Sequence, residues 1–379
     1  MSGRRGRLVR TLAAVLILGL AACASAPGAR GDPGPTGAAE GPEAASQEGP
    51  LLYVCNEGAA SVTVIEMGTR EVVTTVDLRE LGFSTEAKPH HVVAEPDGSH
   101  WYVSLIGENR VLKLDRDHEL VAQAEMETPG LMALDPASDR LYVGRSMKAV
   151  QPPQRIGVIR TADMSVEERE VFVPRPHAIA VQADPGWIHT ASLATNQIAS
   201  LPADDDGLEL IELDEPVRTY VQFALSPDGR RMIATGQTSG ELLDFDVTAP
   251  SSPELIRSLQ LGGEPWHPSY DPGGRLVYVP RKTADAVDVV DVDAWEVAAT
   301  IEDEAISQPH GSVLSPDGRF LFVSNNNLDG AWSPAGSEAA GEDPPGAVVV
   351  IDTRTREVVD VLTVGHNPTG LGTWARSPS

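Results

Sequence analysis

Short apolar runs alternate with turn residues along most of the chain. The stretch from Gln308 to Asn327, QPHGSVLSPDGRFLFVSNNN, holds two apolar runs separated by Pro316-Asp317-Gly318. Proline presets φ for a tight turn, aspartate bonds back to the backbone and glycine tolerates positive φ, so this pattern predicts a β-hairpin. The turns of successive hairpins fall roughly 40 to 48 residues apart, the period of four-stranded propeller blades. Similar hairpins begin at His91, Leu131, Ala178, Gln222 and Ser269.

Seven such units can be placed between residue 51 and the C-terminus. The first unit lacks its opening strand, and the chain supplies a spare strand from Asn367 onward. Pairing that strand into the first unit would close the ring and remove the open sheet edges that promote aggregation. We therefore predict an all-β fold, a seven-bladed β-propeller over residues 51–379 with its C-terminal strand closing the first blade. The second strands of the units begin at Leu52, Trp101, Leu141, Trp187, Met232, Val277 and Leu321.

Residues 1–22 have the pattern of a secretory signal. Four arginines precede an apolar run from Leu12 to Leu20, which is shorter than the ~20 residues of a membrane span. The following Leu20-Ala21-Ala22-Cys23 resembles the bacterial lipobox, which implies that Cys23 is lipidated and becomes the mature N-terminus. The alternative is an ordinary signal cleaved after Ala22 or Ala24.

Residues 23–50 are mostly Ala, Gly, Pro and small polar residues, and they predict a disordered tether behind the lipid. No aspartate follows Cys23, so by resemblance to the bacterial sorting rule the anchor belongs to the outer membrane. The predicted location is the cell envelope, as an outer-membrane lipoprotein facing the periplasm or the cell surface.

The charge balance narrows the range of partners. Cleavage after residue 22 removes Arg4, Arg5, Arg7 and Arg10, which leaves 25 of the 29 basic residues against 55 acidic ones. Such an acidic chain disfavours nucleic acid and anionic lipid surfaces as partners. With Cys23 acylated, Cys55 in the apolar run LLYVC has no disulfide partner, so it is predicted to be a buried and inert strand residue.

Three segments carry a family resemblance. YVCNEGAASVTVIEMGTREVVTTV, PHHVVAEPDG and VVVIDTRTREVVDVLTVGHNPTG resemble the YVTN-type β-propeller repeat, and the likeness extends over residues 51–376. The resemblance implies a fold shared with bacterial surface-layer propellers, the haem-binding propeller of nitrite reductase and the copper-cluster propeller of nitrous oxide reductase. It indicates fold rather than function, because the site and not the propeller determines the chemistry.

Six histidines recur at or near one register of this repeat. Three of them stand six residues before the turn proline or its equivalent, two stand one position later, and one precedes the closing strand, where Thr369 takes the histidine position. We expect all six at one mouth of the central channel, exposed to it, in a ring interrupted by Gly130 and Val221. The histidines are His90, His177, His310, His267, His91 and His366.

Two interpretations of these histidines are open. Neutral imidazoles on convergent loops suit copper, zinc or iron, and the pattern resembles the many-histidine copper site of nitrous oxide reductase, so copper or zinc is the predicted cofactor. The cysteine-rich copper domain of that enzyme is missing here. The alternative is that Pro-His belongs to the repeat and only lines a water-filled channel.

Polar loops after the second strands should open on the same face as the histidines. The loop of the seventh blade extends over residues 325–346, and Trp332 with neighbouring acidic residues is expected to cover the channel mouth; the alternative is an insertion without contacts. The blade-three loop, RSMKAVQPPQR, is also long. The candidate ligand-binding residues are Asn56, Asn109, Arg145, Asn196, Arg281, Asn325 and Trp332.

Familiar catalytic motifs are missing from the sequence, which has no Gly-x-Ser-x-Gly, His-Glu-x-x-His, Cys-x-x-Cys-His or P-loop. A lactonase-like set of Glu57, Asn196 and Asp329 has no spacing to support it. The predicted function is a membrane-anchored, extracytoplasmic scaffold that binds a ligand, a metal or a partner protein through its histidine face. The alternative is a copper-like redox enzyme or an electron-transfer accessory protein.

Overall fold

The computed structural model describes residues 49–135, 137–335 and 343–374, all within the second of the two units into which the chain divides, Glu48–Ser379. The predicted signal segment, Cys23 and nearly all of the tether lie outside these residues. The helices in the described part are the short 3₁₀ turns η1 (Glu57–Ala59) and η2 (Lys282–Ala284). No helix there is long and apolar enough to cross a bilayer.

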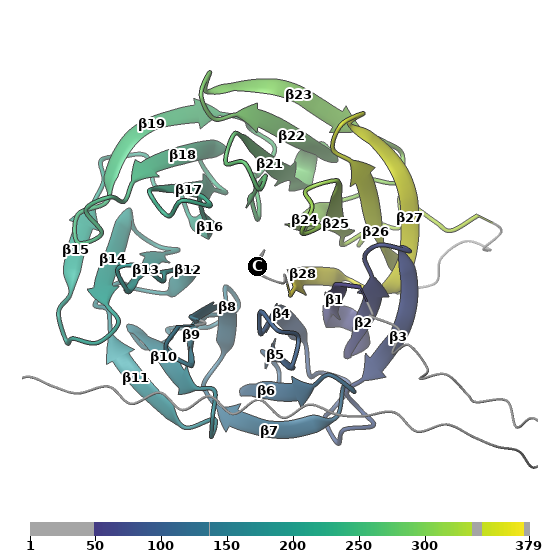
Figure 1. Cartoon of the computed structure of the whole chain (residues 1–379), viewed down its shortest axis with the longest axis horizontal. Helices are drawn as coiled ribbons and strands as arrows, with labels where there is room; N and C mark the ends of the chain where they lie inside the picture. The colour runs from purple at the N-terminus through teal and green to yellow at the C-terminus, as the bar shows by residue number, and fades with distance from the viewer. Residues whose placement is uncertain (1–48, 136, 336–342, 375–379) are drawn as a thin grey trace, which may run out of the picture. The chain divides into compact units, whose positions relative to one another are not determined.

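Seven four-stranded antiparallel sheets are arranged around a central channel, so the predicted seven-bladed propeller is confirmed (Figure 1). Blade 1 consists of β28 (Pro368–Thr373), β1 (Leu51–Asn56), β2 (Ser61–Glu66) and β3 (Glu71–Asp77). Blade 2 consists of β4 (Pro89–Ala94), β5 (His100–Leu105), β6 (Arg110–Asp115) and β7 (Leu120–Glu125). Blade 3 consists of β8 (Pro129–Asp135), β9 (Arg140–Arg145), β10 (Arg155–Arg160) and β11 (Val166–Glu170).

The other four blades follow the same order from the channel outward. Blade 4 has β12 (Pro176–Gln182), β13 (Trp187–Ser192), β14 (Gln197–Pro202) and β15 (Glu209–Glu212). Blade 5 has β16 (Tyr220–Leu225), β17 (Arg231–Gly236), β18 (Glu241–Asp246) and β19 (Glu254–Gln260). Blade 6 has β20 (Ser269–Tyr270), β21 (Leu276–Arg281), β22 (Ala286–Asp291) and β23 (Glu296–Glu302). Blade 7 has β24 (Pro309–Leu314), β25 (Phe320–Asn325), β26 (Pro345–Asp352) and β27 (Glu357–His366).

The last strand of the chain completes the first blade. β28 pairs antiparallel with β1, and its register aligns Leu52 with Thr373 and Val54 with Leu371. Blade 1 therefore contains strands from both ends of the described domain, as the spare strand in the sequence predicted. Closure of this kind leaves the inner strand of the first blade hydrogen-bonded rather than exposed as an edge.

The core is divided among the interfaces between neighbouring blades. Along β1, Tyr53 and Cys55 pack toward blade 2, whereas Leu52 and Val54 pack toward blade 7. Successive strand residues point to opposite faces, and each blade has a neighbour on both faces, so the second strands are buried along most of their length rather than at alternate positions. Cys55 is fully buried, and burial raises the pKa of its thiol well above the usual value, which confirms its predicted place in the core.

Turns of neighbouring blades also contact one another. Gly318 in the turn of blade 7 has a positive φ, and a Cβ added there would lie 2.7 Å from Cδ of Pro272 in the turn of blade 6. Gly274 of blade 6 stands in the same relation to Pro227 of blade 5. The glycine of the turn thus serves both the turn conformation and the close approach of adjacent blades.

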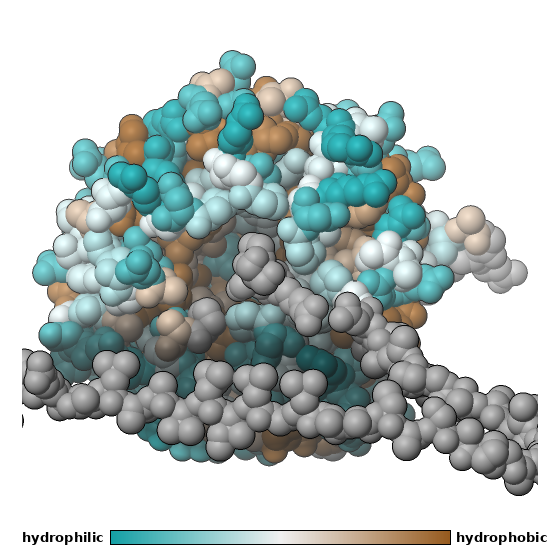
Figure 2. All heavy atoms as spheres, in the orientation of Figure 1, coloured by the Kyte–Doolittle hydropathy of each residue, from teal (hydrophilic) through white to brown (hydrophobic). Residues whose placement is uncertain are grey.

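Hydrophilic residues predominate on the described part of the face seen in Figure 2, with apolar residues between them. This surface agrees with the acidic composition of the chain.

Candidate functional site

Five histidines gather where the inner strands begin. His90 and His91 lie at the start of β4, His177 at the start of β12 and His310 at the start of β24, while His267 lies two residues before β20. The inner strands surround the centre of the ring of blades (Figure 1), and ring contacts between histidines of blades 2, 6 and 7 place their starting points at one end of it. We call His90, His91, His177, His267 and His310 the histidine cluster.

A backbone irregularity places two of these histidines. The register of β4 with β5 shifts between Pro89 and His91, and that of β12 with β13 shifts between Pro176 and Ala178. His90 and His177 are therefore extra residues in their strands, as in a β-bulge, next to a proline that cannot donate to the ladder. The Pro-His pair of the repeat thus coincides with a shift in strand register that leaves His90 and His177 out of the strand pairing.

The rings of the cluster lie close together and are buried. The ring centroids of His267 and His310 are 4.8 Å apart, and those of His91 and His267, and of His90 and His310, are each 6.2 Å apart. None of the five is more than 7% exposed. The expectation that they would be exposed to the channel was wrong, because the rings pack against one another and against neighbouring side chains such as Trp266.

Glu57 connects one side of the cluster to a distant loop. This residue opens η1 in blade 1 and is 4% exposed. Its Oε2 lies 3.0 Å from Nδ1 of His90, and its Oε1 pairs with Nζ of Lys148 from the long loop of blade 3. Burial raises the pKa of Glu57, but the hydrogen bonds and positive charges of His90 and Lys148 outweigh burial and lower it to about 2. The carboxylate is therefore ionised at neutral pH.

Hydrogen bonds define the proton positions of two further rings. Nδ1 of His177 lies 2.7 Å from the carbonyl oxygen of Arg145, which can only accept, so Nδ1 carries the proton and Nε2 has the free lone pair. Nδ1 of His91 instead accepts the backbone N–H of Met132 at 3.2 Å, so the proton of the neutral ring is on Nε2. The cluster thus combines rings that present a lone pair with rings that present an N–H.

The other side of the cluster consists of Trp266, His267, His310 and Lys282. The indole of Trp266 stacks at 34° on the ring of His310, with centroids 4.3 Å apart. The ammonium of Lys282, from η2 in blade 6, lies 4.7 Å from the centroid of the same indole. These side chains come from the loop before β20, the loop after β21 and the start of β24, which the ring of blades brings together.

Burial makes most of these imidazoles neutral. It lowers the pKa of His91 and of His177 to about 3 each. The pKa values of His267 and His310 also lie well below the usual value, chiefly through burial, and neighbouring histidines and Lys282 add to the effect. Burial likewise lowers the pKa of Lys282.

Several ring nitrogens of the cluster lack partners. In the described residues, no hydrogen-bond partner is present for the buried Nε2 of His177, Nε2 of His267 or Nδ1 of His310, nor for Nε1 of Trp266. Buried polar groups in native proteins nearly always have a partner, and each exception requires an explanation. His189, a buried histidine outside the cluster, is different, because its ring contacts Ser200 at 2.8 Å and Gln182 at 3.4 Å.

His366 does not belong to the cluster. It ends β27, keeps part of its side chain exposed, and its Nδ1 lies 2.7 Å from the carbonyl oxygen of Pro344. Among residues 49–135, 137–335 and 343–374, no three or more His, Cys, Asp or Glu side chains are placed so that they could hold a metal ion. The copper or zinc site therefore stays a prediction from the sequence.

The predicted ligand-binding amides are engaged within the fold. Asn56 donates to Ser61 Oγ at 3.0 Å and Thr63 Oγ1 at 2.8 Å. Asn196 donates to the carbonyl oxygens of Asp214 and Pro216, and Asn325 accepts the N–H of Ser307 at 3.1 Å. Asn109 is exposed, and its side chain accepts the N–H of Thr128 at 2.8 Å. These side chains order the loops at this end of the blades.

The predicted arginines and Trp332 have similar structural roles. Arg145 is fully buried, donates to the carbonyl oxygens of Glu127 and Arg155, and pairs with Glu168. Arg281 pairs with Asp288 at 2.9 Å. Trp332 packs against the hydrophobic cluster between blades 6 and 7, and its backbone is bound by Asn327. Trp332 therefore supports a blade interface, and its predicted place over the channel mouth stays a prediction.

Sequence patterns missed three residues of the site. Lys148, Lys282 and Trp266 occupy no shared register of the repeat, although the unusual length of the blade-three loop was a signal for Lys148. Glu57 had been considered only in an unsupported lactonase-like set. The structure places it beside His90 instead.

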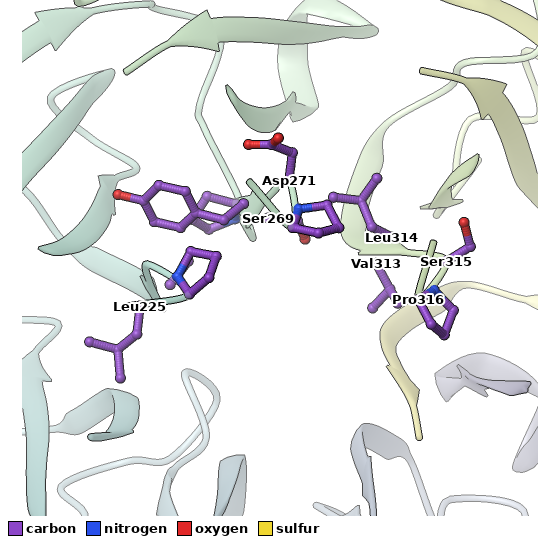
Figure 3. A pocket seen from close by; sticks show the side chains of 12 residues that line it. Leu225, Ser269, Asp271, Val313, Leu314, Ser315 and Pro316 are labelled. Atoms are coloured by element: carbon purple, nitrogen blue, oxygen red, sulfur yellow. The ribbon is translucent and has the colours of Figure 1, made fainter. Parts of the chain in front are cut away.

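A separate cleft of about 400 Å³ lies at the turn end of the inner strands of blades 5, 6 and 7 (Figure 3). Apolar and proline side chains line most of it, including Leu225, Leu314 and Pro316. None of the five cluster histidines lines this cleft, although Pro268, the residue after His267, does.

Comparisons with known proteins place the chain among β-propellers. No family model matches the sequence, so the YVTN-type resemblance is not confirmed at that level. A functionally unknown protein from Desulfotomaculum acetoxidans DSM 771 is similar in structure, with a TM-score of 0.67, 13% identity and coverage of 86% of this chain and 99% of that one.

Two structures with named functions are also similar. Hydrazine synthase from Kuenenia stuttgartiensis has a TM-score of 0.63 and 16% identity, with coverage of 81% of this chain and 93% of that one. The dihydro-heme d1 dehydrogenase NirN, in complex with DHE, has a TM-score of 0.56 and 14% identity, with coverage of 85% of this chain and 74% of that one. At these identities the likeness supports the propeller fold and not a shared activity.

Proposed function

We propose that this propeller is a binding protein that takes a small polar ligand at the histidine cluster. The observation that carries the proposal is the presence of three buried ring nitrogens, on His177, His267 and His310, that have no partner within residues 49–135, 137–335 and 343–374. They converge from three blades onto one mouth of the channel, next to an ionised carboxylate and two lysines.

The energetics favour a binding role over a purely structural one. Each buried polar atom without a partner costs about 1 to 3 kcal/mol of folded-state stability. A core built for stability alone would replace such rings by apolar side chains of similar size. Sites that are polar and imperfectly satisfied in the free protein are typical of binding regions, where stability is lost in favour of function. A bound ligand would supply the missing partners.

The comparisons support this proposal at the level of the fold. NirN, whose structure is described in complex with DHE, holds a ligand in a protein that contains a similar propeller. The proposed setting of the present protein is the cell envelope, where a lipid on Cys23 would attach it to the outer membrane. The signal-like residues 1–22 and the Cys23 motif support that setting.

A stability comparison tests the proposal without knowledge of the ligand. His310→Phe keeps a flat ring against Trp266 and removes the unpartnered nitrogen, so the free energy of unfolding of the ligand-free protein should rise by about 1 kcal/mol or more. The matched control is His189→Phe, which makes the same change of side chain but removes the ring partner of the Ser200 hydroxyl and of Gln182 Oε1. It should lower the free energy of unfolding by about 1 to 3 kcal/mol.

Urea unfolding of the purified protein and both variants provides the measurement. Stabilisation by His310→Phe together with destabilisation by His189→Phe supports a binding site. Equal destabilisation by both variants would show that the histidine cluster is an ordinary part of the core and would overturn the proposal.

A further inference from the structure

We infer that the side of the cluster formed by Trp266, His267, His310 and Lys282 binds an anionic group of the ligand, a carboxylate or another small oxyanion. This inference rests on the proposed function and names the chemistry that the site would recognise. It follows from the charge of Lys282, the donor character of its neighbours and the contrast with the other side of the cluster.

Lys282 is a half-buried ammonium without a counter-ion. In the described residues its Nζ has no ion pair within 4 Å and no hydrogen bond, and its one direct interaction is with the indole of Trp266. Glu264 and Glu57 act on it only through their more distant charges. The chain has 55 acidic residues against 29 basic ones, so a carboxylate partner would have been easy to supply. A half-buried lysine with no ion pair in the described structure leaves its charge available to an anionic group of a ligand.

The neighbouring polar atoms are suited to an acceptor. The indole Nε1–H of Trp266 can only donate a hydrogen bond, and it is buried without a partner in the described structure. A neutral imidazole can place its single proton on the unpartnered nitrogen, which makes Nε2 of His267 or Nδ1 of His310 a donor as well. Three possible N–H donors and one ammonium therefore belong to side chains that contact one another on this side of the cluster.

The arrangement disfavours a cation at this position. A metal ion would be repelled by the ammonium of Lys282 and would leave the indole N–H without an acceptor. An oxyanion satisfies both, and charge-assisted hydrogen bonds are about twice as strong as neutral ones. On the other side of the cluster, Lys148 is already paired with the buried Glu57. The two lysines at this mouth thus differ in whether their charge is available.

Isothermal titration calorimetry of the purified, full-length mature protein tests the inference, with inorganic phosphate and citrate as probes. The wild-type protein should bind at least one of them, and Lys282→Met should weaken that binding at least tenfold. Trp266→Phe keeps the stacking ring but removes the N–H, so it should weaken binding about threefold to tenfold. The matched control Lys113→Met removes a lysine of β6 outside the histidine cluster, whose Nζ donates to the carbonyl oxygen of Thr161 at 2.8 Å, and its affinity should stay within about twofold of the wild type.

The outcomes separate this inference from the proposed function. Absence of binding by both probes, or equal affinity in the wild type, Lys282→Met and Trp266→Phe, overturns the anion site. The stability comparison of His310→Phe with His189→Phe does not depend on phosphate or citrate, so the binding proposal can stand when the anion site fails. If Lys282→Met does not fold, the affinity of Trp266→Phe for phosphate or citrate decides whether the anion site exists, because this variant keeps an aromatic ring against His310.

Discussion

Lys148 of blade 3 forms an ion pair with Glu57 of blade 1, although 91 residues separate them in the sequence and blade 2 lies between them in the ring. The two partners differ in environment, since the Glu57 side chain is 4% exposed and that of Lys148 is 56% exposed. Replacing Lys148 and replacing Glu57 should therefore lower the free energy of unfolding by different amounts.

Loss of the lysine should have a small effect, and loss of the carboxylate a large one. Lys148→Met removes a mostly solvated charge and leaves Glu57 paired with His90, so the free energy of unfolding should fall by no more than about 1 kcal/mol. Glu57→Ala leaves His90 Nδ1–H buried without its acceptor and should cost about 2 to 3 kcal/mol. Urea titration of the two variants measures both values, and a larger loss for Lys148→Met would contradict the assigned pairing.

Acid should destabilise the domain through its buried imidazoles. The pKa values of His91 and His177 are about 3 in the folded protein and near 6.5 when unfolded. As pH falls below about 6.5 the unfolded chain takes up protons that the folded protein excludes, so the stabilising contribution of these rings is complete above that pH and is lost toward pH 3. Each histidine should contribute about 1.4 kcal/mol per pH unit in this window.

Unfolding free energies at intervals between pH 7 and pH 4 test this prediction. The slope should decrease in His177→Gln, which has no titrating ring at this position. A stability that is flat from pH 7 to pH 5 would be incompatible with neutral, buried imidazoles.

The closing strand should tolerate no side chain at Gly370. A Cβ at this position of β28 would lie 2.4 Å from the backbone carbonyl oxygen of His90, and a backbone atom cannot move aside without shifting β4. Gly370→Ala should therefore destabilise the domain by about 1 to 3 kcal/mol, the usual cost of overpacking. In contrast, Gly207→Ala at an exposed position should change stability by less than about 0.5 kcal/mol. Equal melting temperatures for the two variants would argue against tight closure of blade 1 on blade 2.

The predicted anchor is testable independently of the fold. Cys23→Ala removes the lipidation site, so the protein should move from the membrane fraction to the soluble periplasmic fraction. Cys55→Ala is the matched control and should leave the fractionation unchanged. If Cys23→Ala remains with the membranes, the attachment depends on another part of the protein.

The sequence predicted the fold far better than the site. Turns such as Pro316-Asp317-Gly318 are local, because the chemistry of three adjacent residues determines them. The register of Pro89-His90 and Pro176-His177 likewise placed both histidines at one mouth of the channel. Their burial could not be predicted, since it depends on how closely rings from different blades approach across the channel.

The roles of the polar loop residues could not be predicted from the sequence either. Asn56 and Asn325 were recognised as polar side chains on the histidine face, but their hydrogen bonds to Ser61, Thr63 and Ser307 were not visible in the repeat. A polar residue at the end of a strand can order a loop or contact a ligand, and only its neighbours decide between the two.

By itself, the sequence determined the seven hairpins, the displaced strand that closes the first blade and the common end of the histidines, because strand alternation and turn chemistry act within a few residues. The tertiary structure alone decided that Lys148 reaches Glu57, that Trp266 stacks on His310 and that Lys282 has no counter-ion in the described part of the chain. These pairs join residues from different blades or loops, and their contacts exist only once the ring has closed and fixed the distances across the channel.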